Sequence, residues 1–266
     1  LHAVVFAYHD VGVNCLGALL DAGIQVDLVV THQDDPNENV WFGSVAKLCT
    51  EKNIPYITPN ANELVDLIPK LQALAPDYIF SFYYRFMIPE QILGCAKIAA
   101  LNMHGSLLPK YRGRAPVNWA ILHGETETGA TLHIMEAKPD AGDIVGQAAV
   151  TIGPDETATD VFSKVSQAAV SVIKAVLPSL TQGNVPRKPN ELQKGSYFGG
   201  RKPADGEIHW NQTAKQVHDL VRAVAPPYPG AFTNHEGIVM IVARTSLNGP
   251  FPANLDLGVC GIQVVD

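Results

Sequence analysis

The order of apolar and polar positions predicts strands that alternate with helices along the first part of the chain. Short apolar runs rich in β-branched and aromatic residues indicate buried strands, which are expected at residues 3–8, 26–31 and 78–82. Helical spacing of apolar residues predicts helices from residue 16, at 44–52 and at 62–74, with a polar loop at 33–39. Ser44 is a typical N-cap, and Pro76 ends the third helix. This alternation favours a mostly parallel sheet covered by helices on both faces.

A long irregular segment interrupts the same pattern further along. Further strands are expected at residues 99–103, 130–135 and 144–152, and further helices at 117–123 and 158–180. Residues 104–116 contain two Gly and two Pro and show little periodicity. Open α/β sheets bind ligands at the carboxyl ends of their strands, so we expect a site there.

The last third of the chain changes in composition and predicts a second, smaller domain. Residues 182–203 are rich in Gly, Pro, Asn and Lys and have no apolar stripe, which is typical of a linker. We therefore expect a catalytic domain at 1–188, a linker at 189–203 and a β-rich subdomain at 204–266. The subdomain would contain a helix at 214–224 and strands at 238–245 and 257–265. So few strands predict a minimal OB-like domain, or one that is cut short at Asp266.

Composition and charge exclude several classes of protein. With 47% hydrophobic and 17% charged residues, the chain reads as a soluble globular protein, without the run of about 18 apolar residues that a membrane span requires. Its net charge of −7 disfavours nucleic acid as a partner. The cysteines are widely spaced and form no CxxC pair, which favours a reduced, cytoplasmic protein; they are Cys15, Cys49, Cys95 and Cys260.

The candidate chemistry is concentrated just after the strand at 99–103. Asn102 and His104 are two residues apart, so in an extended strand their side chains lie on the same side and can act on one atom. An Asn and a Gly could equally form a simple turn. Lys110, Tyr111, Arg112 and Arg114 follow in the same loop and favour a functional interpretation.

Three other sites are disfavoured. Ser106 lies in no GxSxG elbow, which favours a turn-bonding role over a nucleophilic one. The histidines, His133 among them, form no HExxH motif, so we expect no metal site. Gly12 and Gly17 after the first strand do not make the GxGxxG of dinucleotide binding.

Asp140 is either a turn former before Gly142 or the partner of a histidine, and the sequence alone does not bring it to His104.

Residues 102–116, NMHGSLLPKYRGRAP, resemble the signature of the formyltransferases that use N10-formyltetrahydrofolate. The resemblance continues through Trp119 and residues 124–131 and covers nearly the whole chain. FAYHD at 6–10, SFYYR at 81–85 and VNW at 117–119 are similar to the branch that formylates the 4-amine of UDP-4-amino-4-deoxy-L-arabinose in lipid A modification. His-Gly-Ser at 104–106 replaces the His-Ala-Ser usual in the methionyl-tRNA branch.

The resemblance implies a role for each matching position. Asn102, His104 and Asp140 would be the catalytic triad. The folate would be bound by a larger set, namely Phe86, Met87, Ile88, Arg114, Glu136, Ala137, Lys138, Pro139 and Asp140. Phe86 departs from the branch, which often has His there. From their chemistry, we expect Arg112 and Arg201 to pair with the diphosphate of the acceptor, with Tyr111 as a further acceptor residue. Tyr83, Tyr111 and Trp119 are candidates to stack a base or the pterin, and core packing is the alternative for Trp119.

The expected ligands follow from the same resemblance. They are N10-formyltetrahydrofolate as formyl donor and a nucleotide sugar as acceptor, without a metal, nucleic acid or membrane insertion. A decarboxylase domain, fused or associated, is an expected partner, and none of it is present in this sequence. The alternatives are another nucleotide-sugar N-formyltransferase, a methionyl-tRNA formyltransferase, or a non-catalytic module that binds folate or a sugar nucleotide.

Overall fold

The computed structural model describes residues 1–33 and 40–247. The predicted loop at 33–39, apart from residue 33, the strand at 257–265 and Cys260 lie outside the described residues. The chain divides into two compact units, each built from three segments. The first unit comprises Leu1–Arg112, Gly129–Ala149 and Val165–Ser196, and the second comprises Gly113–Thr128, Val150–Lys164 and the chain from Tyr197 onward.

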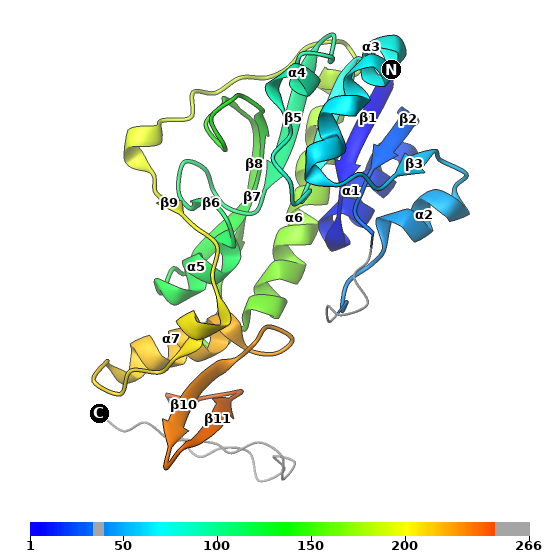
Figure 1. The fold of residues 1–266 in the computed structure, drawn as a ribbon. Coiled ribbons are helices and arrows are strands. Elements are labelled where there is room, and N and C mark those ends of the chain that lie inside the picture. Colours follow the sequence, from blue (N-terminus) through cyan, green and yellow to red (C-terminus); the bar gives the residue numbers. More distant parts are fainter. Residues whose placement is uncertain (34–39, 248–266) are drawn as a thin grey trace. The chain divides into compact units, whose positions relative to one another are not determined.

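The first unit is built on a mostly parallel sheet, which confirms the predicted fold class. Within the described residues seven strands pair in the order β3-β2-β1-β4-β5-β7-β8 (Figure 1). Their bounds are β1 His2–Ala7, β2 Gln25–Val30, β3 Tyr56–Ile57, β4 Tyr78–Phe82, β5 Ala99–His104, β7 Glu127–Ile134 and β8 Ile144–Thr151. The pairs from β3 to β5 are parallel and β5 pairs with β7 in antiparallel register. The chain order reverses between β1 and β4, where sheets of this kind bind ligands.

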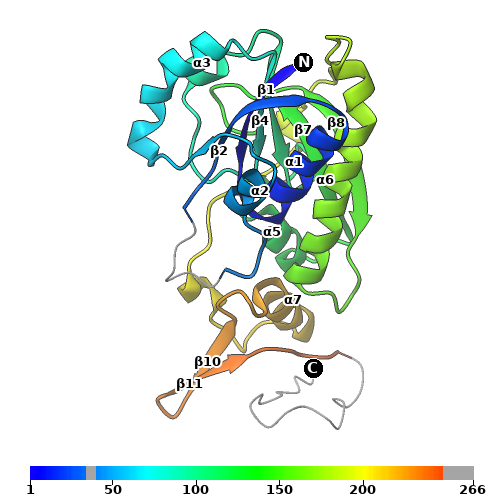
Figure 2. The same cartoon turned by 90° about the vertical axis from the view of Figure 1, so that its right-hand side faces the viewer.

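Helices cover both faces of this sheet, as the unbroken apolar strands require. On one face Val4 and Phe6 of β1 pack in an apolar cluster with Leu64, Leu71 and Ile92. These come from the 3-10 helix η1 (Ala61–Leu67), α3 (Ile68–Leu74) and α4 (Glu90–Leu93). Figure 2 shows α1 (His9–Asp21) and α6 (Ala158–Leu180) on the opposite side of the sheet from α3.

Local sequence explains where several helices begin. Ser44 caps α2 (Val45–Glu51) as predicted, because its Oγ accepts the Lys47 backbone N–H at 3.3 Å. The single helix predicted at 62–74 is instead a 3-10 helix followed by α3. Pro69 fits this break, because it has no N–H to continue the hydrogen bonds of the preceding turn and is tolerated in the first turn of a new helix.

α6 coincides with the helix predicted at 158–180. It is the one helix in the described ranges that is long and apolar enough to cross a membrane, which the sequence reading had not anticipated. Of its most apolar stretch, 56% is buried inside the protein. A core helix of a folded domain has this property.

The second unit is built around α7 (Ala214–Val224), whose bounds match the prediction. α7 packs against α5 (Pro116–Leu122). Its buried Arg222 donates from Nε to Asp219 Oδ1 at 2.9 Å and from Nη1 to the carbonyl oxygens of Gly153 and Glu156, both at 3.2 Å. A hairpin of β10 (Ala231–His235) and β11 (Ile238–Val242) follows, of which only the second strand was predicted. This small β element confirms the predicted C-terminal β domain.

The segment predicted as a linker contains ordered structure. Within 189–203 lie the 3-10 helix η2 (Leu192–Lys194) and β9 (Tyr197–Phe198), which pairs with β6 (Arg112–Gly113). Another 3-10 helix, η3 (Pro203–Gly206), begins at its end. Strands of two residues carry no readable periodicity, so the pattern could not show them.

Candidate active site

β5 ends with the two residues on which the functional prediction depends. Asn102 and His104 lie on the same side of the strand, and the antiparallel register places His133 of β7 directly opposite Asn102. The Asn102 Nδ2 lies 3.1 Å from His133 Nε2. His104 and His133 are both buried, with 7% and 2% of their side chains exposed.

The partners of His104 determine which of its nitrogens carries a proton. Its Nε2 lies 2.7 Å from the carbonyl oxygen of Tyr111, and because a carbonyl can only accept, Nε2–H is the donor. In the neutral ring Nδ1 is therefore unprotonated, and it lies 3.5 Å from Asp140 Oδ1. Burial lowers the pKa of His104, although the Asp140 charge and the bond to Tyr111 act in the opposite direction.

The connection between β7 and β8 brings Asp140 into this cluster. Its Oδ1 lies 3.3 Å from His133 Nε2 as well as near His104. The backbone of Asp140 is left-handed (φ 51°), a conformation that Asp tolerates better than most residues. Asn190 Nδ2 lies 3.1 Å from the Asp140 carbonyl oxygen and 3.2 Å from that of Gly142, and so holds the loop from outside. The structure thus brings the three predicted triad residues together.

The loop after His104 is held by a network of hydroxyl and amide groups. Thr131 Oγ1 donates to the carbonyl oxygen of Ser106 at 2.6 Å and accepts from Gln147 Nε2 at 2.8 Å. Ser106 Oγ donates to the Lys110 carbonyl at 2.7 Å, which is the turn-bonding role favoured by the sequence. This network positions the Tyr111 carbonyl that accepts from His104.

The two segments predicted to bind folate border the apolar cluster that Val4 and Phe6 of β1 form with the helices on one face of the sheet. Phe86 and Ile88, which follow β4, pack against it with half-buried side chains, and so does Met135, which precedes Glu136. Met87 is 63% exposed, and Glu136, Ala137 and Lys138 are exposed as well. Half-buried apolar side chains beside exposed loop backbone suit a flat heteroaromatic ring with polar edges. The residues present therefore fit the pterin of a folate, Phe86 included.

Of the predicted acceptor residues, Tyr111 and Arg112 belong to the first unit. Both are buried, with 7% and 9% exposed. The backbone N–H of Tyr111 donates to Ser196 Oγ at 2.9 Å, and that of Arg112 donates to the Ser196 carbonyl at 3.0 Å. Their direct contact with a ligand stays a prediction.

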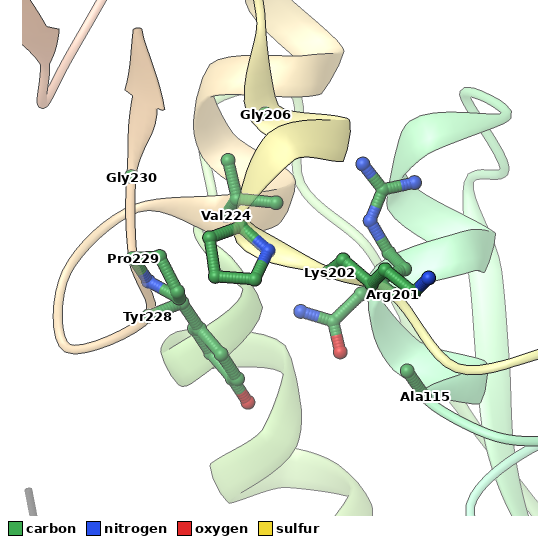
Figure 3. A pocket seen from close by; sticks show the side chains of 10 residues that line it. Ala115, Arg201, Lys202, Gly206, Val224, Tyr228, Pro229 and Gly230 are labelled. Carbon is green, nitrogen blue, oxygen red and sulfur yellow. The ribbon is translucent and has the colours of Figure 1, made fainter.

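Arg114 and Arg201 belong to the second unit. Arg114 is exposed, whereas Arg201 lines a pocket of about 240 Å³ (Figure 3). Figure 3 shows Arg201 and Lys202 on one side of this pocket and Val224, Tyr228 and Pro229 on the other.

Arg201 is already oriented by its neighbours. Its guanidinium carbon lies 4.8 Å from the centre of the Trp119 ring, and its Nη2 donates to the Asp205 carbonyl at 2.7 Å. Burial lowers the pKa of Arg201. Trp119 also stacks on Phe198 with ring centres 4.9 Å apart and donates from Nε1 to the Gly199 carbonyl. Trp119 thus packs against other residues of the protein. These contacts give no support to the expectation that it stacks on a ligand.

Sequence reasoning missed three residues that support the site. They are His133, which was set aside with the other histidines, and Asn190 and Ser196, which were assigned to the linker. A polar residue on a strand opposite Asn102 would have indicated His133, but only with the strand register known. The sequence holds no comparable signal for Asn190 or Ser196.

Two protein-family models match this sequence. The formyl transferase family model matches residues 4–177, and the model of the formyl transferase C-terminal domain matches residues 201–252. The chain belongs to the formyltransferase family. The resemblance on residues 102–116 is thereby confirmed for the family.

Solved structures of formyltransferases share this fold. A 4-N formyltransferase from Francisella tularensis is 25% identical, with a TM-score of 0.73 over 91% of this chain and 96% of that one. WlaRD, a sugar 3N-formyltransferase solved with dTDP and 5-N-formyl-THF, is 21% identical with a TM-score of 0.73 over 91% and 85%. The N-formyltransferase from Helicobacter canadensis, solved with folinic acid and dTDP-3-aminofucose, is 22% identical with a TM-score of 0.67 over 89% and 84%.

Proposed function

We propose that this formyltransferase transfers a formyl group from N10-formyltetrahydrofolate to the amine of a nucleotide sugar. The observation that carries the proposal is the cluster of Asn102, His104 and Asp140 at the carboxyl end of β5. Similar structures described as a 4-N and a sugar 3N-formyltransferase support a sugar amine as acceptor.

The reaction forms a bond between the acceptor nitrogen and the formyl carbon and breaks the bond from that carbon to N10. One proton moves from the acceptor amine to N10, and the folate supplies the formyl carbon. The Asn102 Nδ2–H would stabilise the negative charge that develops on the formyl oxygen. His104 would accept the amine proton at Nδ1 and pass it on, with the adjacent Asp140 carboxylate stabilising the imidazolium in between.

The finer proposal is that the acceptor is UDP-4-amino-4-deoxy-L-arabinose, whose 4-amine is formylated during lipid A modification. It is supported by FAYHD at 6–10, SFYYR at 81–85 and the His-Gly-Ser at 104–106. Such an enzyme would act in the cytoplasm, next to a decarboxylase that makes its acceptor. In this proposal Arg112 and Arg201 pair with the diphosphate, because a guanidinium fork matches phosphate oxygens, and Tyr111 is a further acceptor residue.

A panel of acceptors tests both levels of the proposal. Purified protein is incubated with N10-formyltetrahydrofolate and, separately, UDP-4-amino-4-deoxy-L-arabinose, a dTDP-4-amino sugar, dTDP-3-aminofucose and methionyl-tRNA. Mass analysis is expected to find one added formyl group on the UDP sugar. Preference for a dTDP sugar would contradict the finer proposal only, and transfer to methionyl-tRNA alone would contradict both.

The triad variants provide the control for this assay. Loss of one oxyanion donor costs roughly 10²–10³-fold in kcat, so Asn102→Ala is expected to lose about that much while folate still binds. Binding without transfer by the wild type would favour the non-catalytic alternative. Full activity of His104→Ala would remove the assignment of His104.

A further inference from the structure

His133 is a second histidine at the centre of the site, and the proposed reaction gives it no role. It lies on β7 opposite Asn102, and only 2% of its side chain is exposed. A buried imidazole must satisfy both ring nitrogens or lose the hydrogen bonds it makes with water. Its partners therefore indicate what it does.

The two ring nitrogens of His133 have partners of opposite kinds. Nδ1 lies 2.8 Å from the carbonyl oxygen of Ile134, which can only accept, so Nδ1 carries the proton. In the neutral ring Nε2 is then a lone pair, and the Asn102 amide donates to it at 3.1 Å. The lone pair repels Oδ1 of Asn102 and attracts Nδ2. His133 thus determines which end of the carboxamide lies toward β7.

We propose that His133 is a positioning residue for formyl transfer: as a neutral acceptor it fixes the Asn102 carboxamide, so that the second Nδ2–H points to the formyl oxygen. The proposal rests on the proposed function, since it assigns Asn102 the role of oxyanion donor. An amide free to turn would present its oxygen to that charge for part of the time. Preorganised donors are effective because they need not reorient during the reaction.

The groups that face His133 set the condition under which it can play this role, because Asp140 competes with Asn102 for its Nε2. They are Asn102 and His104 from β5 and Asp140 from the β7–β8 connection. Asp140 Oδ1 lies 3.3 Å from His133 Nε2 and 3.5 Å from His104 Nδ1. A proton on His133 Nε2 would make this nitrogen a donor to the carboxylate and leave no lone pair to accept the Asn102 amide hydrogen. The positioning role therefore requires the neutral ring with its proton on Nδ1.

Nitrogen NMR of the wild-type protein tests the arrangement without turnover. Long-range proton–nitrogen correlations distinguish the two neutral tautomers and the imidazolium of each histidine. His133, assigned from the signals lost in His133→Gln, is expected in the Nδ1–H form. His104, assigned from His104→Gln, is expected in the Nε2–H form and serves as an internal comparison. An Nε2–H or doubly protonated His133 at neutral pH overturns the proposal.

Kinetics then test whether the arrangement matters for formyl transfer. His133→Leu removes the acceptor and is expected to lower kcat about tenfold or more, below the roughly 10²–10³-fold of losing Asn102 itself. His133→Gln keeps an acceptor oxygen and is expected to restore most of kcat. The KM values for both substrates should change little, because the effect concerns the transition state.

A double variant identifies the route of the effect. In an Asn102→Ala background, His133→Leu is expected to cause almost no further loss, since residues that act through one another are not additive. An equal loss in both backgrounds overturns the proposal. Absence of formyl transfer by the wild type would instead contradict the proposed function, while the NMR result still decides whether His133 orients Asn102.

Discussion

The charge of Asp140 opposes the effect of burial on the pKa of His104. His104 is buried and its pKa is lowered, mainly because burial disfavours the imidazolium. The Asp140 carboxylate, 3.5 Å away, raises that pKa and limits the shift. In the proposed reaction, Asp140 would therefore favour proton uptake by His104 from the acceptor amine.

Asp140→Asn therefore has a predicted direction on the pH axis. Without the carboxylate the pKa of His104 falls further, so the acid limb of the rate profile, where His104 becomes protonated, moves to lower pH. We also expect kcat to fall by about 10²-fold, as for the loss of assisted proton transfer. The measurement is kcat for formyl transfer over roughly pH 5 to 9. An acid limb that stays in place or moves to higher pH would contradict the role of Asp140.

At the scale of elements, a histidine joins the segments that follow β2 and β4. The Arg85 backbone N–H donates to His32 Nε2 at 3.0 Å, and the His32 ring stacks on Tyr84 with centres 4.3 Å apart. Burial, aided by the charge of Arg85, lowers the pKa of His32 from 6.5 to about 4. The next residues, Phe86 to Ile88, are those predicted to bind folate, so His32 supports that segment.

The contribution of His32 to the stability of the fold is expected to depend on pH. Because the native pKa of about 4 is below the ordinary 6.5, the unfolded chain binds a proton first as the pH falls. The contribution of His32 is present above about pH 6.5 and is lost progressively toward pH 4. His32→Gln keeps an acceptor but does not titrate, so its melting temperature should fall less than that of wild type across this window. Equal falls in both proteins, measured by calorimetry, would contradict the prediction.

The elements also show how far the sequence could lead. Residues 158–180 and 214–224 were predicted to the residue, since long amphipathic helices carry a strong periodic signal. Asn102 and His104 could be paired because both belong to one strand. The approach of Asp140 and His133 depends on the β5–β7 register and on a loop with left-handed backbone, neither of which has a signature in a single sequence.

At the scale of the whole molecule, the net charge is negative, whereas the pocket lined by Arg201 carries positive side chains. The chain carries a net charge of −7, which repels an anionic nucleotide sugar in general. The pocket of the second unit nevertheless presents Arg201 and Lys202 side by side. We therefore expect this pocket to bind a small anionic ligand, whereas the acidic background disfavours polyanions such as tRNA.

Arg201→Lys tests this pocket. The variant keeps the charge but loses the planar fork, so we expect the KM for the nucleotide sugar to rise about tenfold, with the KM for folate and kcat little changed. Arg187, whose side chain is 58% exposed in the first unit, provides the matched control Arg187→Lys, which should behave as wild type. An unchanged KM in Arg201→Lys would exclude the pocket from acceptor binding.

The chain between the two predicted domains has a consequence for building chimeras with relatives. Asn190 donates hydrogen bonds to the backbone carbonyls on either side of Ala141. Ser196 accepts hydrogen bonds from the backbone N–H groups of Tyr111 and Arg112. A crossover before Ser196 would pair one parent's catalytic loops with one or both of the other parent's supporting residues, even though no residue of the triad had been exchanged. Recombination that aims to change the accepted sugar should therefore place its splice point after Phe198.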